Sequence, residues 1–316
     1  MRCLCDMTPA QAAGAAGDLG VLLGLPIERT RYPRRDARAA RLAEIEEELF
    51  RLLRRAWAKG GEDAIGQAVR ALRVGAGKLT PAEVDELLAA MSAMLGPEGF
   101  GAAVATSVRG AVVEAYDLGR RSFVAKPAFS LVDMRARDWL ARNNNYWIGE
   151  HYGSHVGPVI AETVKTEIVE AGLGRRAAGE RLREIMEPQF GKRAEGYWRG
   201  VAASARTRAR NFGAVESFVE GGFAELEVVA MMDERTSEIC RAMNGKVFRV
   251  EWAAQQRDRM LAAKTPEEAR DVAPWPQVDK ETAGQIAKED PRDIARARGI
   301  LLPPYHFNCR TIVVVR

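Results

Sequence analysis

The sequence is poor in residues that bind metals or form disulfides. Only four cysteines and three histidines occur among its 316 residues. Small secreted domains that depend on disulfides use cysteine far more densely, so a disulfide scaffold is excluded. Cys3 and Cys5 lie in an alanine- and glycine-rich start, whereas Cys240 and Cys309 lie in patterned sequence. Any metal or thiol chemistry is therefore expected at Cys240 and Cys309.

Long hydrophobic runs are also missing. The apolar segment 19–25 (LGVLLGL) is far shorter than the roughly 20 residues that cross a bilayer as a helix. Asp6 and Asp18 stand where a secretory signal would be basic and then apolar. We therefore expect a chain that is made in the cytoplasm and has no membrane partner.

An excess of one charge is missing too. The formal net charge is +4, and residues 226–316 hold 15 Lys and Arg against 14 Asp and Glu. Bulk charge thus excludes a dedicated nucleic-acid domain, and any such contact must come from a local patch. The chain also has no glycine-rich phosphate loop, no G-x-S-x-G elbow and no H-E-x-x-H motif. We expect no small-molecule substrate.

Apolar residues recur at helical spacing through the first two thirds of the chain. One such stripe is formed by Leu42, Ile45, Leu49, Leu52 and Leu53. Thr80 and Pro81 are typical of a helix start, and Gly96 marks the expected end of that helix. No segment before Gly221 alternates with a period of two, so this part of the chain is predicted to be helical.

The pattern changes after Gly221. Strands are predicted within 224–232, 247–250 and 311–315, with a charged helical stretch over about 251–298. We therefore expect a mainly α protein in which a long helical N-terminal region precedes a small α+β domain with two or three short strands. The expected divisions are a flexible or partner-docked arm (1–30), a helical region (31–222) and the α+β domain (223–316).

Zinc ligands occur in two separated pieces of this domain. Cys240 follows the first predicted strand, while His306 and Cys309 precede the last one. Thiolate and imidazole are ligands that zinc prefers, and Asp233 or a water would complete the four ligands of a structural site. Two alternatives remain: buried thiols beside a hydrogen-bonded histidine, or a disulfide between the two cysteines. Zinc is thus an open expectation.

The same pieces predict a structural clasp between the last strand and the segment that follows the first. Arg310 can form a bidentate ion pair, and Asp233 is the natural partner. The clasp is expected to comprise Asp233, Arg235, Thr236, Cys240, His306, Cys309 and Arg310.

Several motifs in this region carry a family resemblance. D-x-R-T-S-x-x-C-R-A-x-N-G-K-V-F begins at Asp233, and P-P-x-H-x-x-C-R ends at Arg310. With Ala205-Arg206-Thr207 and Asn211, they resemble the C-terminal domain of phage head morphogenesis proteins, the Mu protein F-like minor head family, over about 195–316. The resemblance implies a low-copy structural protein of the virion head, assembled near the portal. Its implied partners are the portal protein, the major capsid protein or scaffold, and packaged DNA.

A rival hypothesis is a metal-dependent nuclease or toxin-like enzyme. It would use His306 as a base, with Cys240 and Cys309 on zinc. No second histidine or acidic pair stands nearby in the sequence to supply both a ligand and a general base. We therefore expect the protein not to be an enzyme.

Two further groups of residues have the spacing of possible sites. Arg199, Arg206 and Arg210 recur at spacings of seven and four on a predicted helix, so they share a face that could contact DNA phosphates, an acidic portal surface or solvent. His151 and His155 are four residues apart, but Gly153 between them favours a bent segment over a helical metal site.

Overall fold

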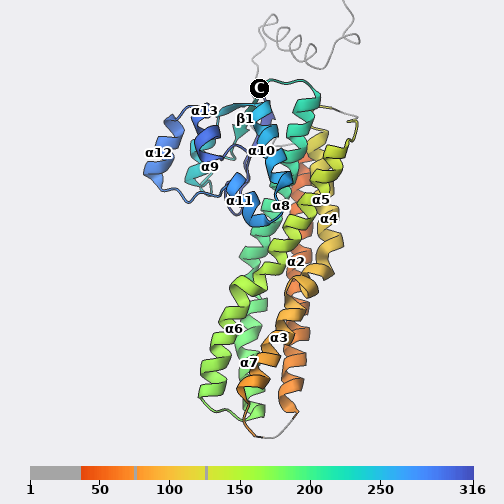
Figure 1. The fold of residues 1–316 in the computed structure, drawn as a ribbon, viewed down its shortest axis with the longest axis vertical. Helices are drawn as coiled ribbons and strands as arrows, with labels where there is room; N and C mark the ends of the chain where they lie inside the picture. Colours follow the sequence, from red (N-terminus) through yellow and green to blue (C-terminus); the bar gives the residue numbers. More distant parts are fainter. Residues whose placement is uncertain (1–36, 75–76, 125–126) are drawn as a thin grey trace, which may run out of the picture. The chain divides into compact units, whose positions relative to one another are not determined.

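The computed structural model describes residues 37–74, 77–124 and 127–316, so the predicted arm over 1–30 lies outside the described residues. The described chain is mainly helical with one small antiparallel sheet, which confirms the predicted fold class (Figure 1). It forms two compact units. Glu44–Val112 and Asp138–Ala205 make the helical unit, and Val113–Arg137 and Arg206–Arg316, with the segment up to Ala43, make the sheet unit.

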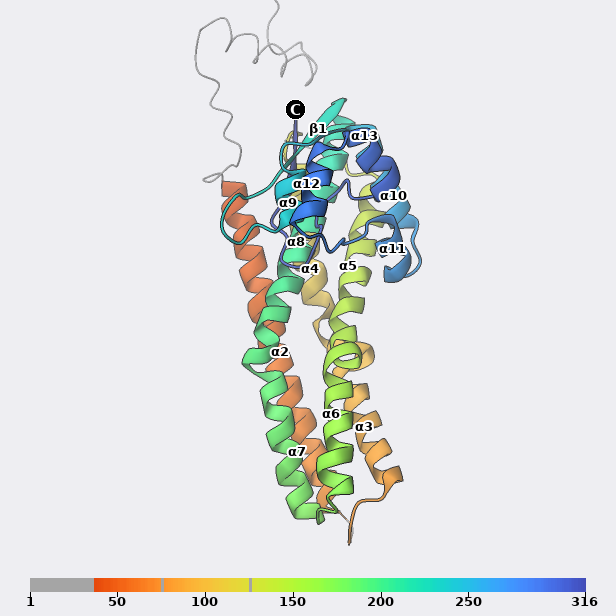
Figure 2. The same ribbon diagram turned by 90° about the vertical axis from the view of Figure 1, so that its left-hand side faces the viewer.

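The helices α2, α3, α6 and α7 run side by side in the bundle of the helical unit (Figures 1 and 2). The elements up to the sheet are α2 (Ala37–Arg73), α3 (Pro81–Leu95), η2 (Pro97–Gly101), α4 (Ala102–Arg120), α5 (Leu131–His151), η3 (Tyr152–Val156), α6 (Gly157–Val164), η4 (Lys165–Glu170), α7 (Arg175–Phe190) and α8 (Lys192–Glu220), where η denotes a π-helical segment. Aromatic rings fill the core of this unit: the centroid of Trp57 lies 5.0 Å from those of Phe100, His151 and Phe190, and 5.3 Å from that of Trp198.

The start of α3 follows directly from its sequence. The Thr80 side chain accepts a hydrogen bond from the backbone of Glu83, whose carboxylate accepts one from the Thr80 backbone in return. This capping box satisfies two N–H groups that a helix start leaves without partners. At the other end, Gly96 is extended and separates α3 from η2.

The stretch Pro81–Arg120 is long and apolar enough to cross a membrane by length and composition alone. Its apolar side chains have a packing role, because one residue per turn or so is buried inside the bundle. The buried ones include Val84, Leu87, Met91, Leu95, Val104, Val108 and Val112. The extended Gly96 also interrupts the stretch, so it is not one continuous α-helix.

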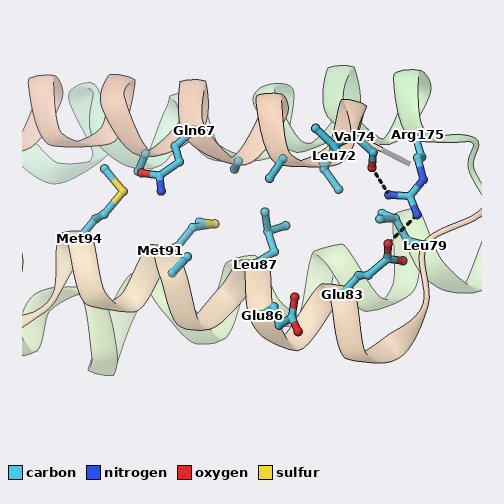
Figure 3. Close-up of a pocket in the computed structure, with 14 residues that line it drawn as sticks. Gln67, Leu72, Val74, Leu79, Glu83, Glu86, Leu87, Met91, Met94 and Arg175 are labelled. Carbon is cyan, nitrogen blue, oxygen red and sulfur yellow. Dashed lines mark hydrogen bonds and ion pairs between the residues drawn. The ribbon is translucent and has the colours of Figure 1, made fainter. Parts of the chain in front are cut away.

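A groove of about 440 Å³ runs between α2 and α3 in the helical unit (Figure 3). Leu72, Leu87 and Met91 form much of its apolar wall. At one end Arg175 donates to the Glu83 carboxylate (2.6 Å) and to the carbonyl oxygen of residue 74 (3.0 Å). The groove is therefore mainly apolar, with Gln67 and Glu86 also in its lining, and it is ionic at the Arg175 end.

The predicted bend around Gly153 was wrong. The backbone stays helical from α5 through η3 into α6, because a π-helical turn absorbs the glycine without ending the helix. His151 and His155 consequently lie on one face, with ring centroids 5.7 Å apart.

Two helices of the sheet unit approach each other closely where each has a glycine. A Cβ atom on Gly119 of α4 would lie 2.1 Å from the carbonyl oxygen of Arg210 on α8. A Cβ atom on Gly213 of α8 would likewise lie 2.1 Å from the carbonyl oxygen of Tyr116 on α4. Real side chains do not tolerate such distances, so both positions require glycine. This contact fixes the part of α8 that carries the C-terminal segment.

The sheet has the strand order β2-β1-β3, with both pairs antiparallel. Its strands are β1 (Glu225–Val229), β2 (Val247–Arg249) and β3 (Ile312–Val315). Between them lie α9 (Glu238–Met243), α10 (Val250–Ala262), α11 (Pro266–Val272), α12 (Lys280–Lys288), α13 (Pro291–Asp293) and η5 (Ile294–Arg298). Leu226 pairs with Val315 and Val229 with Ile312, so the last strand of the chain lies beside the first. The three predicted strands are confirmed.

Candidate functional site

A buried cluster of two thiols and one imidazole lies beside this sheet. The ligand atoms of Cys240, His306 and Cys309 all lie within 4.8 Å of one another, and we call these residues the Cys/His cluster. The Cys240 Sγ lies 3.2 Å from the His306 Nε2 and 3.7 Å from the Cys309 Sγ. The two sulfur atoms are not bonded to each other. The fold thus brings together three residues that the sequence predicted to meet.

Each member of the cluster is positioned by local structure. The hydroxyl of Ser237 caps α9 and accepts a hydrogen bond from the backbone N–H of Cys240 (3.4 Å). His306 Nδ1 lies 2.5 Å from the Phe307 carbonyl oxygen, to which its N–H donates. In the neutral ring this hydrogen bond leaves the lone pair on Nε2, which faces the cluster, as in histidines whose second nitrogen binds a metal. The Thr311 hydroxyl lies 3.0 Å from the Cys240 Sγ.

The two thiols differ in acidity. Burial alone would raise the pKa of Cys309, but hydrogen bonds from Cys240 and His306 bring that pKa well below its ordinary value. The hydrogen bond to Cys309 and burial raise the pKa of Cys240. Burial alone would lower the pKa of His306, and its interaction with Cys309 raises it instead. Cys309 is therefore the member that most readily becomes a thiolate, the form that binds metals.

The predicted ion pair of the clasp is present. Arg310 Nη1 donates to Asp233 Oδ2 (2.8 Å) and Nη2 donates to Asp233 Oδ1 (2.6 Å). The Thr236 hydroxyl accepts a hydrogen bond from the backbone N–H of Asp233 (2.8 Å) and donates to the carbonyl oxygen of Met231. These contacts tie the segment before β3 to the segment after β1.

The side chains of Asp233 and Arg235 do not lie where their predicted roles would place them. The Asp233 carboxylate is not a member of the cluster, because Arg310 holds both of its oxygens. A water rather than Asp233 is thus left to complete a metal shell. Arg235 contributes only its backbone N–H, which donates to Asp233 Oδ1 (3.0 Å), while its side chain is exposed.

Asp233→Asn is expected to remove a pH-dependent part of the stability. The hydrogen bond from Arg310 holds the pKa of Asp233 below its ordinary value. A carboxyl with a lowered folded-state pKa stabilises the fold above its unfolded pKa of about 3.9, and this contribution is lost as the pH falls through the folded value. The difference in melting temperature between wild type and Asp233→Asn should therefore be constant near neutral pH and shrink below about pH 4.

Thermal melts from pH 7 to pH 3 measure this difference. Asp271→Asn supplies the baseline for removing one exposed carboxylate of the same unit. A wild-type advantage that is unchanged down to pH 3 would show that the ion pair contributes no acid-sensitive stability.

Two residues of α8, Thr207 and Asn211, hold the C-terminal segment and were not predicted as site residues on physical grounds. Thr207 Oγ1 donates to the carbonyl oxygen of Cys309 (2.8 Å). The Asn211 amide donates to the carbonyl oxygens of Pro303 and Thr311 and accepts from the backbone N–H of Val313 (3.1 Å). The family resemblance included Thr207 and Asn211 as motif letters. The only physical signal that could have identified Thr207 and Asn211 is that both are polar residues on the apolar face of α8.

The three arginines of the predicted stripe have different surroundings. Arg210 is 9% exposed, and its Nη1 donates to the carbonyl oxygen of Val313 (2.6 Å) and to Asn211 Oδ1 (2.8 Å). It is the third α8 residue that holds the C-terminal segment, so it is not available to DNA phosphates. Arg199 is half exposed, pairs with Glu47 (3.3 Å) and lies 4.0 Å from the ring centroid of Phe50. Arg206 is partly buried. A DNA contact stays a prediction for Arg199 and Arg206.

His151 belongs to the aromatic core of the helical unit. Its ring stacks on Tyr197 with centroids 3.8 Å apart, and it is 5% exposed. Burial, with the charge of His155, lowers the pKa of His151 to about 3, so the ring is neutral near pH 7. Among the described residues, His151 and His155 do not form a metal-binding cluster with a third His, Cys, Asp or Glu side chain.

The geometry first defines a class: a small antiparallel-sheet domain in which a Cys/His cluster and an Arg–Asp pair tie the last strand to the segment after the first. The model of the Phage Mu protein F like family matches residues 160–314. This match confirms the resemblance and extends it from residue 195 back to residue 160. No curated protein and no solved structure matches the chain significantly.

The family match supports a role in phage head morphogenesis. It also supports association with other head components and a place in the virion. A structural head protein family favours the expectation of a protein that is not an enzyme over the nuclease hypothesis.

Proposed function

We propose that this protein is a minor head protein that acts in head assembly beside the portal and the packaged DNA. The observation that carries the proposal is the family match over 160–314, a range that contains the Cys/His cluster, the Asp233–Arg310 pair and all three strands. Every one of these features makes or stabilises contacts within the chain. They suit a protein that must keep its shape inside an assembly.

The docking surface for the portal, capsid or scaffold protein is proposed within the first 190 residues. The aromatic stretch 146–152 offers little surface for such a contact, because Tyr152 is buried and Tyr146 and Trp147 are partly buried. Exposed apolar side chains occur instead near the start of α5, where Leu131 is 72% exposed and Met134 is 52% exposed. Exposed apolar groups close together on a surface are typical of protein–protein contacts.

Changing Leu131 and Met134 together to Gln in the full-length protein should reduce its incorporation into heads several-fold. Both side chains are largely exposed, so the melting temperature should stay within the range of ordinary surface changes. The amount of protein in purified heads measures the effect, and Val159→Gln, at a side chain that is 46% exposed on α6, is the matched control. Normal incorporation of the double variant would place the docking surface elsewhere.

We also propose that the Cys/His cluster binds a zinc ion that stabilises the sheet unit. The donor set fits: two cysteines and one histidine, with the second histidine nitrogen fixed by the Phe307 carbonyl oxygen. Zinc would hold Cys240 of α9 and the segment before β3 together, and this is the junction that the Asp233–Arg310 pair also bridges.

A further inference from the structure

A basic hollow of about 660 Å³ lies in the sheet unit. It is lined by Trp252, Gln255, Asp258, Arg259, Arg292, Ala295, Arg296 and Leu301. The spacings within this set are helical: the first four residues share one face of α10, and Arg292, Ala295 and Arg296 share one face of the turns α13 and η5. Two helical faces therefore converge on the hollow, and none of the sites predicted from the sequence includes it.

The arginines of the hollow have no counter-ions within the described chain. Arg259, Arg292 and Arg296 are exposed, and none of the three side chains makes an ion pair or hydrogen bond with a described residue. Many other arginines of the described chain do: Arg298, next but one to Arg296, holds Glu289. The hollow thus gathers three guanidinium groups that pair with no side chain of the described residues.

The single carboxylate in the lining does not neutralise them. Asp258 Oδ1 accepts from Arg257, whose Nη2 lies 2.9 Å away. Arg257 is 4% exposed and also pairs with Glu216 (2.5 Å) on α8. Arg257 carries one positive charge against these two carboxylates, so the Asp258 charge is only partly offset. One carboxylate and three guanidinium groups line the hollow, and its lining therefore keeps an excess of positive charge.

The walls of the hollow are held in place before any ligand binds. Gln256 of α10 is 1% exposed and donates to the carbonyl oxygens of Val272 (3.0 Å) and Gly299, while its Oε1 accepts from the backbone N–H of Leu302 (2.9 Å). These bonds fix α10 against the segment that follows η5. Because the backbone segments that carry the arginines are already fixed relative to each other, only the side chains lose conformational freedom when an anion binds.

We infer that this basic hollow binds the phosphate backbone of duplex DNA. Guanidinium groups suit phosphates because they donate two parallel hydrogen bonds, and an open hollow admits a continuous chain of phosphates. The partly buried Trp252 offers an apolar surface for the sugar, and the amide of Gln255 can donate a hydrogen bond to a phosphate oxygen. The inference rests on the proposed place of the protein beside packaged DNA, and it deepens that proposal by locating the contact.

The test replaces Arg259, Arg292 and Arg296 together with Gln in the full-length protein. Duplex DNA of random sequence is the probe, and its affinity is measured at 50 to 200 mM NaCl. If three phosphate contacts are lost, the slope of log affinity against log salt becomes less negative by about 2.7, so the wild type loses about 40-fold more affinity across this range than the variant. A control triple, Arg183→Gln, Arg249→Gln and Arg316→Gln, removes the same charge from exposed arginines elsewhere and should keep the wild-type slope.

Two further measurements separate the outcomes. The pair Arg199→Gln and Arg206→Gln tests the stripe on α8, and a flattened slope in that pair alone would overturn the inference. Equal slopes for the variant that lacks the three arginines of the hollow and for the control triple would also overturn it. These arginines would then face solvent or another protein. Incorporation into heads is measured in parallel: failure of the wild type to enter heads contradicts the proposed function, whatever the DNA slopes are.

Discussion

Asn211→Ala is expected to lower the free energy of unfolding by about 3 kcal/mol, the cost of leaving buried hydrogen-bonding groups without partners. The Asn211 side chain is fully buried and bonds to three separate backbone groups of the C-terminal segment. Alanine would leave the Val313 N–H without this acceptor and would open a cavity on α8. The guanidinium of Arg210, which donates to Asn211 Oδ1, would lose that acceptor as well.

Chemical denaturation of the full-length protein at neutral pH measures this change. Asn211→Asp separates the two halves of the effect, because a carboxylate keeps the acceptor for Val313 and Arg210 but loses both donated bonds. Gln285→Ala removes an exposed amide from α12 in the same unit and should change the stability by less than about 0.5 kcal/mol. An Asn211→Ala loss no larger than that of the control would mean that the C-terminal segment is held by other contacts.

The fold could be predicted largely from local signals. The Thr80 cap, the glycine at position 96 and the apolar run before the end of the chain each act within a few residues, and each marks the element that the structure contains. The failure at Gly153 is also local. Glycine weakens a helix by a modest amount, and the packing of Tyr152 and Val156 in the core outweighs that loss.

The site could be predicted only where its residues are chemically unusual. Cysteine and histidine are scarce in this chain, so their position at the ends of strands suggested the Cys/His cluster. Arg210 and Asn211 have no such signal, because their partners lie about one hundred residues later in the sequence. Helical spacing alone placed Arg210 on an exposed stripe. Helical spacing shows which residues share a face, and it does not show what that face contacts.

Zinc removal is expected to lower the melting temperature of the wild-type protein by roughly 5–10 °C. A ligand present at 100 times its dissociation constant stabilises the folded state by about 2.7 kcal/mol, and each kcal/mol corresponds to roughly 2–4 °C for a chain of this size class. The effect should be reversed by adding zinc back and should not occur in Cys309→Ser, because Cys309 is the residue whose pKa most favours the thiolate. Cys3→Ser with Cys5→Ser also removes thiols but leaves the cluster intact, so this double variant should respond to the chelator as the wild type does.

The zinc content of the purified protein decides between a metal centre and free or paired thiols. One zinc per chain, retained in the Cys3/Cys5 double variant and lost with His306→Gln, supports the metal centre. Absence of zinc after expression in zinc-supplemented medium, together with identical melts with and without chelator, contradicts it. A thiol count under denaturing conditions then separates the two remaining alternatives. The Cys240 and Cys309 sulfurs lie 3.7 Å apart, so oxidation of the two thiols by dissolved oxygen, with a modest approach of their side chains, would form a disulfide. Loss of two reactive thiols that reappear on reduction would identify that bond, whereas a full count would leave buried thiols held by His306 and Thr311.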